Sequence, residues 1–269
     1  SGFHPVEVIK GRLKVSGTNR FSQGLVILQF ALSIVLIITA LVMSRQMTFL
    51  QTKNLGFNPE QVIVIDTFGL KKEEKKRMLD VYRQAEVQHS DILKVSMANM
   101  SIDRGTSWGS GGTYQERSFS FRTFVVDYDY LETLDIKLKE GRTFSQDFKS
   151  DVKEAVMINE ALLKQLGWDS AVGKKLPFFG RRTIVGVIQD FHFKSLRQEI
   201  PGAVFNLQRG NGSLQYILIR IGSEDITSML ATLQNAWDQV ILDRPFMYSF
   251  LDADVDRQYR SEEHWGRIV

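Results

Sequence analysis

The stretch from Gly24 to Met43 reads GLVILQFALSIVLIITALVM and contains no charged side chain. At about 1.5 Å of rise per residue, about 20 apolar residues span the roughly 30 Å hydrocarbon core of a bilayer. The alternatives are a buried core helix, which normally carries a polar stripe, and a cleaved signal peptide, which has a shorter apolar region before a small-x-small site. This stretch is apolar all round, and MSRQMTFLQTK follows it without such a site. The sequence therefore predicts a transmembrane helix over residues 23–45.

Basic residues flank the predicted transmembrane helix unequally. Four of them precede it, namely Lys10, Arg12, Lys14 and Arg20. Only Arg45 and Lys53 follow it closely. Because cytoplasmic flanks of membrane helices carry the excess of lysine and arginine, we expect residues 1–22 in the cytoplasm and the rest of the chain outside.

The overall composition is that of a globular protein. The chain has 269 residues, of which 43% are hydrophobic and 24% are charged. The net charge of +3 is too small to indicate a nucleic-acid partner. The chain has no cysteine, which excludes disulfides and thiolate chemistry.

Two strand–helix–strand patterns lie beyond the apolar stretch, one near each end of the remaining chain. Their strands are β-branched or aromatic runs such as QVIVID, and their helices carry apolar residues at helical spacing. Trp237 lies on the apolar face of the second helix. The elements are expected at 61–66, 72–90 and 92–99 in the first unit and at 214–221, 223–241 and 246–252 in the second. We predict that these two β-α-β units pack into one sheet.

An α+β lobe is predicted between the two units, over residues 100–211. It opens with IDRGTSWGSGGTYQERS, whose glycine and serine content is typical of a loop. EAVMINEALLKQLG predicts a strand that runs into a helix, with Gly167 placed to end that helix. Further strands are expected at 119–126, 181–191 and 203–207. The predicted fold class is therefore α+β, with one transmembrane helix followed by two β-α-β units and an inserted lobe.

No residue pattern indicates catalysis, a cofactor or a metal site. His192 follows Asp190 by two residues, but no further partner is identifiable, and none of the histidines lies in an H-E-x-x-H pattern. The segment GWDSAVGKKL approaches a phosphate-binding loop, but the glycines Gly167 and Gly173 are one residue too far apart and the hydroxyl residue is missing. This segment also follows a predicted helix rather than a strand. We therefore expect no ATP binding by this chain.

The glycine-rich segment from 103 to 117 is the best candidate for contact with a partner. Large aromatic side chains on a mobile polar loop suit partner binding, and charged neighbours can orient it. The candidate contact residues are Trp108, Tyr114, Glu116 and Arg117. The alternative is a disordered connector between two lobes.

Four stretches together resemble the permeases of the FtsX/MacB-like ABC transporter family, in particular the large eight-span members with two exterior domains. They are GFHPVEVIKG, LVILQFALSIVLIITALVMSRQMTFLQTKNLGFNPEQVIVI, GVIQDFHFKSL and YRSEEHWGRIV. The resemblance implies a cytoplasmic linker at 1–22, the first span of the second permease half at 23–45, a porter-like periplasmic lobe at 46–99 and 212–256, an inserted periplasmic lobe at 100–211, and the truncated start of the next membrane segment at 257–269.

The resemblance also implies a function without catalysis in this chain. A separate cytoplasmic ATP-binding subunit would supply energy, and the periplasmic domain would convey the resulting conformational change to an extracytoplasmic protein or substrate. Membrane lipid would surround the span in the inner (cell) membrane, and the assembly would be dimeric or pseudo-dimeric. The alternatives are a single-span extracytoplasmic ligand sensor and a membrane-anchored enzyme.

Overall fold

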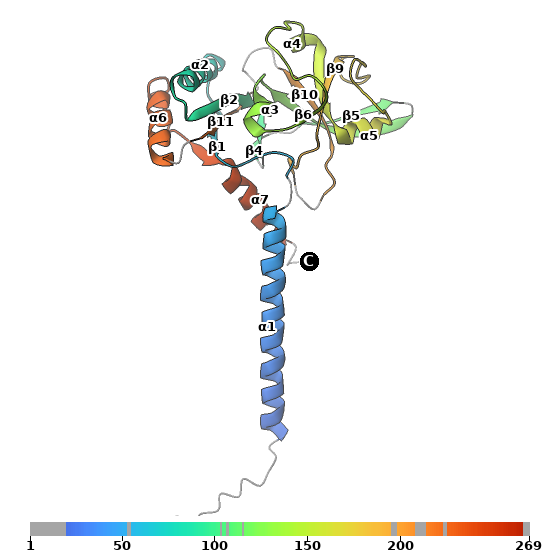
Figure 1. Ribbon diagram of the computed structural model, residues 1–269, viewed down its shortest axis with the longest axis vertical. Helices are drawn as coiled ribbons and strands as arrows, with labels where there is room; N and C mark the ends of the chain where they lie inside the picture. The colour runs from blue at the N-terminus through green and yellow to red at the C-terminus, as the bar shows by residue number, and fades with distance from the viewer. Residues whose placement is uncertain are drawn as a thin grey trace, which may run out of the picture. The chain divides into compact units, whose positions relative to one another are not determined.

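The computed structural model describes residues 20–52, 55–102, 104–105, 108–114, 116–194, 198–207, 214–222 and 225–265. The chain forms two compact units, Ser1–Asn54 and Leu55–Val269 (Figure 1). The fold class is the predicted one, an apolar helix followed by a mixed domain of helices and sheet.

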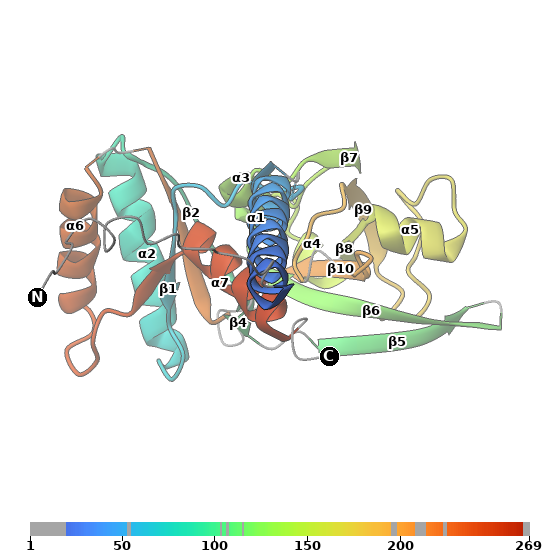
Figure 2. The same ribbon diagram turned by 90° about the horizontal axis from the view of Figure 1, so that it is seen from below.

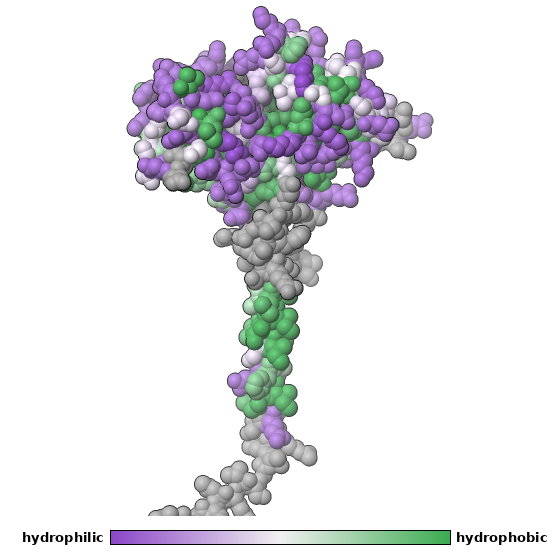
Figure 3. Space-filling model, in the orientation of Figure 1, coloured by the Kyte–Doolittle hydropathy of each residue, from purple (hydrophilic) through white to green (hydrophobic). Residues whose placement is uncertain are grey.

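The first unit contains one long helix, α1 (Arg20–Thr52). Within the described residues, its Gln23–Met43 part is the one helical segment long and apolar enough to cross a membrane, and its side chains are exposed (Figure 3). Ser33 and Thr39 donate their hydroxyls to backbone carbonyls one turn earlier, so neither polar group needs an external partner. The structure describes α1 as far as Thr52, and Gly56, in the second unit, adopts a φ of +79°.

The second unit is built on a ten-stranded sheet in the order β12-β1-β11-β2-β6-β10-β8-β9-β7, with β5 paired to β6. The strands of this sheet are β1 (Val62–Asp66), β2 (Ile92–Ala98), β5 (Trp108–Tyr114), β6 (Arg117–Val126), β7 (Leu138–Gly141), β8 (Ala155–Asn159), β9 (Thr183–Ile188), β10 (Gly202–Leu207), β11 (Tyr216–Ile221) and β12 (Tyr248–Phe250). A separate pair is formed by β3 (Met100–Ser101) and β4 (Arg104–Gly105).

The four strands β12, β1, β11 and β2 form what we call the four-stranded half. Here β11 lies antiparallel between β1 and β2, and β1 lies antiparallel between β11 and β12. The two β-α-β units are thus interleaved, with each placing a strand inside the other. The prediction that they pack into one sheet is confirmed. Their helices, α2 (Lys72–Gln88) and α6 (Ile226–Asp238), lie together on one face of these strands (Figure 2).

The other six strands form the six-stranded half, which has mixed pairing. Parallel pairs join β10 to β6 and β8 to β9, and antiparallel pairs join β10 to β8 and β7 to β9. Its helices are short: α4 (Asp151–Glu154) and α5 (Glu160–Leu166). The equally short α3 (Tyr130–Leu134) follows β6 in the chain and packs on β2 and β11 of the four-stranded half. The predicted strand-to-helix passage is present as β8 followed by α5, and Gly167 ends α5 in the left-handed conformation.

Two hydrophobic cores flank the four-stranded half. The first lies under α2 and α6 and includes Met78, Tyr82, Leu233 and Trp237. Trp237 is 1% exposed, which confirms that it lies on a buried helix face. The second lies on the opposite face, runs on without a break into the six-stranded half, and includes the start of α7 (Leu251–Trp265).

Candidate functional sites: the interlobe joint and the glycine-rich hairpin

The two halves of the sheet meet where β2 and β6 pair, a place that we call the joint. Ladder pairing there consists of a single residue pair, Ala98 with Val126. The backbone adds one hydrogen bond on each side: Asn99 N donates to Val125 O at 2.9 Å, and Asp127 N donates to Met97 O at 3.0 Å. This pairing is short compared with the ladder between β11 and β2.

Side chains extend the joint where the strand pairing stops. Asp127 Oδ2 accepts from Met97 N at 2.8 Å, and Asn99 Oδ1 accepts from Val125 N at 2.9 Å. These two side chains therefore take over bonds that a longer ladder would supply.

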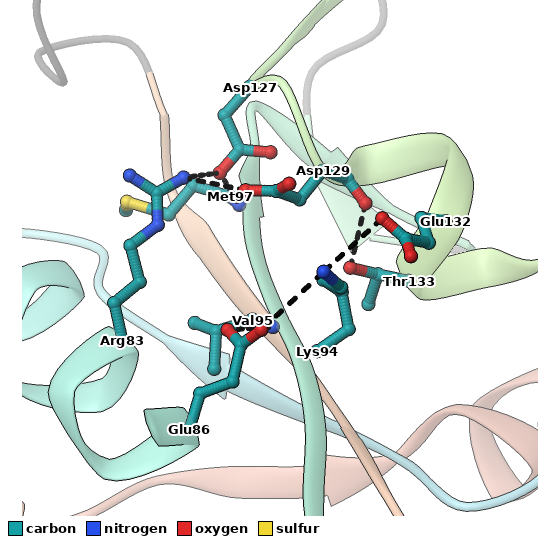
Figure 4. A network of polar contacts seen from close by, with 9 residues as sticks. All are labelled: Arg83, Glu86, Lys94, Val95, Met97, Asp127, Asp129, Glu132 and Thr133. Atoms are coloured by element: carbon teal, nitrogen blue, oxygen red, sulfur yellow. Dashed lines mark hydrogen bonds and ion pairs between the residues drawn. The ribbon is translucent and has the colours of Figure 1, made fainter. Parts of the chain in front are cut away.

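A network of ion pairs surrounds the joint (Figure 4). Arg83 on α2 reaches Asp127 and Asp129, both at 3.1 Å, and so joins α2 to the segment between β6 and α3. Behind it, Lys94 on β2 pairs with Glu86 of α2 at 3.5 Å and Glu132 of α3 at 3.2 Å. The network ties α2, β2 and α3 to the segment that follows β6, the first strand of the six-stranded half.

Burial dominates the electrostatics of Asp127. It raises the pKa of this carboxyl to about 7, although Arg83 and the Met97 N–H both favour the charged form. Its Oδ1 atom is buried and has no hydrogen-bond partner among the described residues. The pKa of the neighbouring Tyr130 is also raised, by burial and then by Asp127. The joint therefore contains one carboxyl group, that of Asp127, whose pKa is near neutral pH. Its described residues include no identifiable nucleophile.

A second polar group holds the segment through which the chain reaches β1. Residues 55–61 are named here the lead-in segment. Arg220 on β11 donates to Asn58 O at 2.7 Å, to Glu60 O at 3.1 Å and to Thr133 O at 2.7 Å. Burial lowers the pKa of Arg220. One guanidinium thus connects the lead-in segment, the sheet and α3.

The lead-in segment also contacts the six-stranded half. Leu55 O accepts from His192 N at 2.8 Å, and the rings of Phe57 and Phe191 meet edge to face at 6.0 Å. Gly56 lies so close to Phe191 that an added Cβ would come within 2.7 Å of its Cα. The lead-in segment is therefore held from both halves at once.

The glycine-rich segment forms a β-hairpin, so the predicted loop was wrong over Trp108–Tyr114. This strand, β5, pairs antiparallel with β6 from Trp108 opposite Thr123 to Tyr114 opposite Arg117. Its inner face is fixed: Tyr114 packs edge to face on Trp168 at 5.8 Å, and an added Cβ at Gly112 would come within 2.5 Å of Phe178. Glycine at position 112 therefore allows close packing of Phe178 on the strand, and it does not indicate a flexible backbone.

The structure does not bring all four predicted contact residues together. Tyr114, Glu116 and Arg117 lie at the hairpin turn, where Glu116 is exposed and has a φ of +63°. Trp108 lies at the far end of β5, six residues away, or about 20 Å along an extended strand. The side chains of Trp108 and Arg117 lie outside the described residues.

The carboxylate of Asp190 accepts hydrogen bonds from residues other than His192, which indicates a structural role. Its Oδ1 atom accepts from Asn159 Nδ2 at 2.8 Å and from Ala161 N at 2.9 Å. Burial raises its pKa. In the part of the chain that the structure describes, no cluster of three His, Asp or Glu side chains could hold a metal ion.

No local sequence pattern indicates the residues of the joint or Arg220. The signal for Asp127 was a carboxylate directly after an apolar strand, in DYDY, but its partner Arg83 lies 44 residues earlier. Nothing local indicates that the two meet.

Comparison with known proteins identifies relatives of this fold. A family model described as MacB-like periplasmic core domain matches residues 24–238. The periplasmic region of MacB from Actinobacillus actinomycetemcomitans is similar in structure, with a TM-score of 0.51, 17% identity, and coverage of 75% of this chain and 94% of that one. At this identity the likeness concerns the fold alone.

Two further solved structures are more distant. The extracellular domain of the noncanonic ABC-type transporter YknZ from Gram-positive bacteria has a TM-score of 0.47 at 13% identity, covering 70% of this chain and 98% of that one. A domain of a putative permease protein from Porphyromonas gingivalis has a TM-score of 0.45 at 14% identity, covering 71% and 89%. A search of curated proteins found no match.

Proposed function

Because the chain belongs to the family of MacB-like periplasmic core domains, we propose that it is the part of an ABC transporter permease that conveys conformational change to the outside of the cell. The resemblance to the FtsX/MacB-like permeases is confirmed by the family match. The chain is thus a membrane-associated component with an extracytoplasmic domain, and its family is one of transporter components rather than enzymes.

The observation that carries this proposal is that contacts from both halves of the sheet hold the lead-in segment. Residues 55–61 are the first part of the second unit that follows α1 along the chain, so a movement of the membrane helix would act first on this segment. Arg220 fixes it to β11 and α3, while Phe57 fixes it to Phe191. A displacement there would therefore be passed to both halves of the sheet together.

The joint would keep the two halves moving as one body. The core that runs through both halves and the ion pairs of Arg83 resist separation of β2 from β6. The energy would come from a separate cytoplasmic ATP-binding subunit in a dimeric or pseudo-dimeric assembly.

The proposed orientation places residues 1–22 in the cytoplasm and the second unit in the periplasm, with α1 in the inner membrane. It is supported by the excess of lysine and arginine before the apolar stretch. The chain lacks native cysteine, so a single Ser150→Cys change gives a unique label. Ser150 is exposed, and it should react with an impermeant maleimide in intact spheroplasts.

The hairpin turn remains the proposed contact with an extracytoplasmic protein or substrate. Glu116 is exposed there and Arg117 is its neighbour. Trp108 would contribute from the far end of β5, and Tyr114 would act mainly by holding the turn against Trp168.

The coupling role can be tested in the full permease reconstituted with its ATPase. Spin labels at Ser150→Cys in the two copies should report a change in distance when ATP and vanadate are added. Arg220→Gln should reduce that change, because the lead-in segment loses its donor to Asn58 O and Glu60 O. Arg181→Gln, an exposed arginine of the six-stranded half, is the matched control. An undiminished distance change in folded Arg220→Gln protein would contradict the proposal.

A further inference from the structure

The joint has two ends that differ in the side chain that closes them. At one end Asn99 N donates to Val125 O at 2.9 Å, and Val125 N donates to Asn99 Oδ1 at 2.9 Å. At the other end Asp127 N donates to Met97 O at 3.0 Å, and Met97 N donates to Asp127 Oδ2 at 2.8 Å. The bonds follow the same pattern at both ends, but a neutral amide closes one end and an ionisable carboxyl group closes the other.

The two oxygens of the Asp127 carboxyl group have different surroundings. Oδ2 is contacted by Met97 N and by Arg83 Nη2, whereas Oδ1 is buried and has no hydrogen-bond partner among the described residues (Figure 4). In the ionised form, Oδ1 would lose its hydration without a donor to replace the water. The proton of the neutral form therefore belongs on Oδ1.

The groups around Asp127 contain more carboxylates than cations. Arg83 is shared between Asp127 and Asp129, both at 3.1 Å, so one cation serves two carboxylates. The other cation, Lys94, is occupied by two glutamates. The ionisable side chains around this end of the joint come from α2, β2, the segment after β6 and α3, and they are Arg83, Glu86, Lys94, Tyr128, Asp129, Tyr130 and Glu132.

Asp127 is the group of this cluster that changes charge near neutral pH. Burial raises its pKa to about 7, against the opposing effects of Arg83 and the backbone N–H groups of Met97 and Asp129. Burial also raises the pKa of both tyrosines, so neither is charged in this range. Asp127 has the least exposed side chain of the four carboxylates, and it loses most when it is ionised in place.

Opening of this end into water would release the proton. In water the carboxyl group would regain a pKa of roughly 3.9. The closed joint therefore binds one more proton than the opened joint between about pH 4 and pH 7. Closure is most favoured at the acidic end of this window. Opening becomes easier by about tenfold per pH unit as pH rises, and the effect levels off above about pH 7.

The contacts of the joint confine such an opening to the Asp127 end. Val126, which pairs with Ala98 in the middle of the joint, is 1% exposed and belongs to the core that runs through both halves. This core and the neutral Asn99 end hold β6 on β2 throughout the window. Ladder pairing stops after Val126, so the Asp127 end depends on its bonds to Met97 and on Arg83.

We propose that the joint is a proton-dependent contact between the two halves of the sheet: a proton on Asp127 holds this end closed on β2, and its loss lets Asp127 and Asp129 move toward water while the Asn99 end stays paired. The inference goes beyond the proposed transporter role, because it concerns how firmly the halves are joined at a given pH. It is tested on the chain alone, so its failure would leave that role untouched.

Hydrogen exchange resolved to single amides tests this proposal on the full chain in detergent micelles from pH 4.5 to pH 7.5. Protection factors are used, since they remove the intrinsic pH dependence of exchange. The amides of Met97 and Asp127 should lose protection by about tenfold per pH unit and level off near pH 7. The amides of Asn99 and Val125, which make the matching bonds at the neutral end, should keep their protection.

Two variants separate the carboxyl group from other causes. Asp127→Asn removes the titrating group and keeps an acceptor, so the Met97 amide should be protected to the same extent at every pH. Asp129→Asn removes the carboxylate that competes for Arg83, which lowers the pKa of Asp127, so the loss of protection should level off at a lower pH. It also tests the proposal where Asp127→Asn does not fold.

Three results would each overturn the proposal. The first is that the amides of Met97 and Asp127 follow those of Asn99 and Val125 at every pH. The second is that all four amides lose protection together, which would be a global opening. The third is a pH dependence at Met97 that persists in Asp127→Asn or that does not move in Asp129→Asn.

Discussion

The two halves of the sheet are stabilised by different kinds of contact. The four-stranded half has a core made by helix faces: Met78 and Tyr82 from α2 meet Leu233 and Trp237 from α6 over the strands. The six-stranded half has only short helices. Leu162 and Leu166 of α5 cover a hydrophobic core there, to which buried hydrogen bonds and stacked aromatic rings are added, such as Phe124 on Phe205 with centroids 4.6 Å apart. Both halves therefore bury apolar area, and the six-stranded half depends in addition on buried hydrogen-bonding residues such as Asn159.

The largest expected effect tests the core under α2 and α6 in the four-stranded half. Trp237→Ala removes a side chain that is 1% exposed and leaves a cavity under α6, so it should cost about 3–5 kcal/mol of unfolding free energy. Denaturant unfolding of the purified chain in detergent, followed by circular dichroism, measures this loss. Leu242→Ala, on an exposed side chain of the adjoining loop, should change stability by less than about 0.5 kcal/mol. A loss below about 1 kcal/mol for Trp237→Ala would show that the helix face contributes little.

The next effect tests a buried hydrogen-bonding residue of the six-stranded half. Asn159 has no exposed surface and makes four hydrogen bonds: it donates to Asp190 Oδ1 and Pro201 O, and it accepts from Leu162 N and Ala203 N. Asn159→Ala leaves buried N–H groups unpaired, and each costs about 1–3 kcal/mol, so we expect a loss of about 2–4 kcal/mol. Asn235→Ala, on the exposed side of α6, is the control. Equal stability of the two variants would show that the hydrogen bonds of Asn159 add little to the stability of the six-stranded half.

The same distinction explains what the sequence could predict. The elements of the four-stranded half follow from local patterns. A helix that buries one face against a sheet shows apolar residues at helical spacing, and a buried strand is rich in β-branched or aromatic residues. Trp237 was identified in this way. The pairing order was not readable from the pattern alone, and only the expectation of one sheet followed from it.

The predictions failed where a residue acts through a distant partner. The glycines of β5 predict a loop when only their neighbours in sequence are considered, because the ring of Phe178 that packs on Gly112 lies 66 residues later. Asp127 was passed over because Arg83 and the Met97 N–H, which give it a role, come from another part of the chain. A local pattern predicts an element, but not which side chain will satisfy an element elsewhere.

A smaller effect concerns the joint between the halves. The pKa of Asp127 is about 7 in the folded chain, above the roughly 3.9 of an unfolded aspartate, so the fold binds an extra proton between about pH 4 and pH 7. Stability from this group is therefore fully present at the acidic end of the window and is lost as pH rises through 7. We expect Asp127→Asn to remove that slope and to raise the unfolding midpoint at pH 8 relative to wild type.

The measurement is a series of thermal unfolding curves from pH 4.5 to pH 8 for both proteins. Taking the difference between them cancels the titration of histidines and other common groups. Asp129→Asn, which keeps the Arg83 contact to Asp127, should leave most of the slope in place. A wild-type slope that persists in Asp127→Asn would assign the pH dependence to another group.

The smallest expected effect on stability concerns the hairpin turn, where the structure changes how the contact hypothesis should be tested. A double change of Trp108→Ala and Tyr114→Ala would also remove the packing of Tyr114 on Trp168, so lost activity could reflect a displaced hairpin. Glu116→Lys avoids this problem, because Glu116 is exposed at the turn. We expect an unfolding free energy within about 0.5 kcal/mol of wild type and a loss of cellular transport activity.

Comparison of Glu116→Lys with Glu116→Gln tests whether the charge of Glu116 contacts a partner. If Glu116 meets a basic group on a partner, reversal of its charge should be more damaging than neutralisation, because like charges brought together at an interface cost more than a missing pair. Both variants should assemble with the ATPase and retain its basal ATP hydrolysis. Full transport activity in Glu116→Lys would show that the turn is a rigid extension of the six-stranded half rather than a contact.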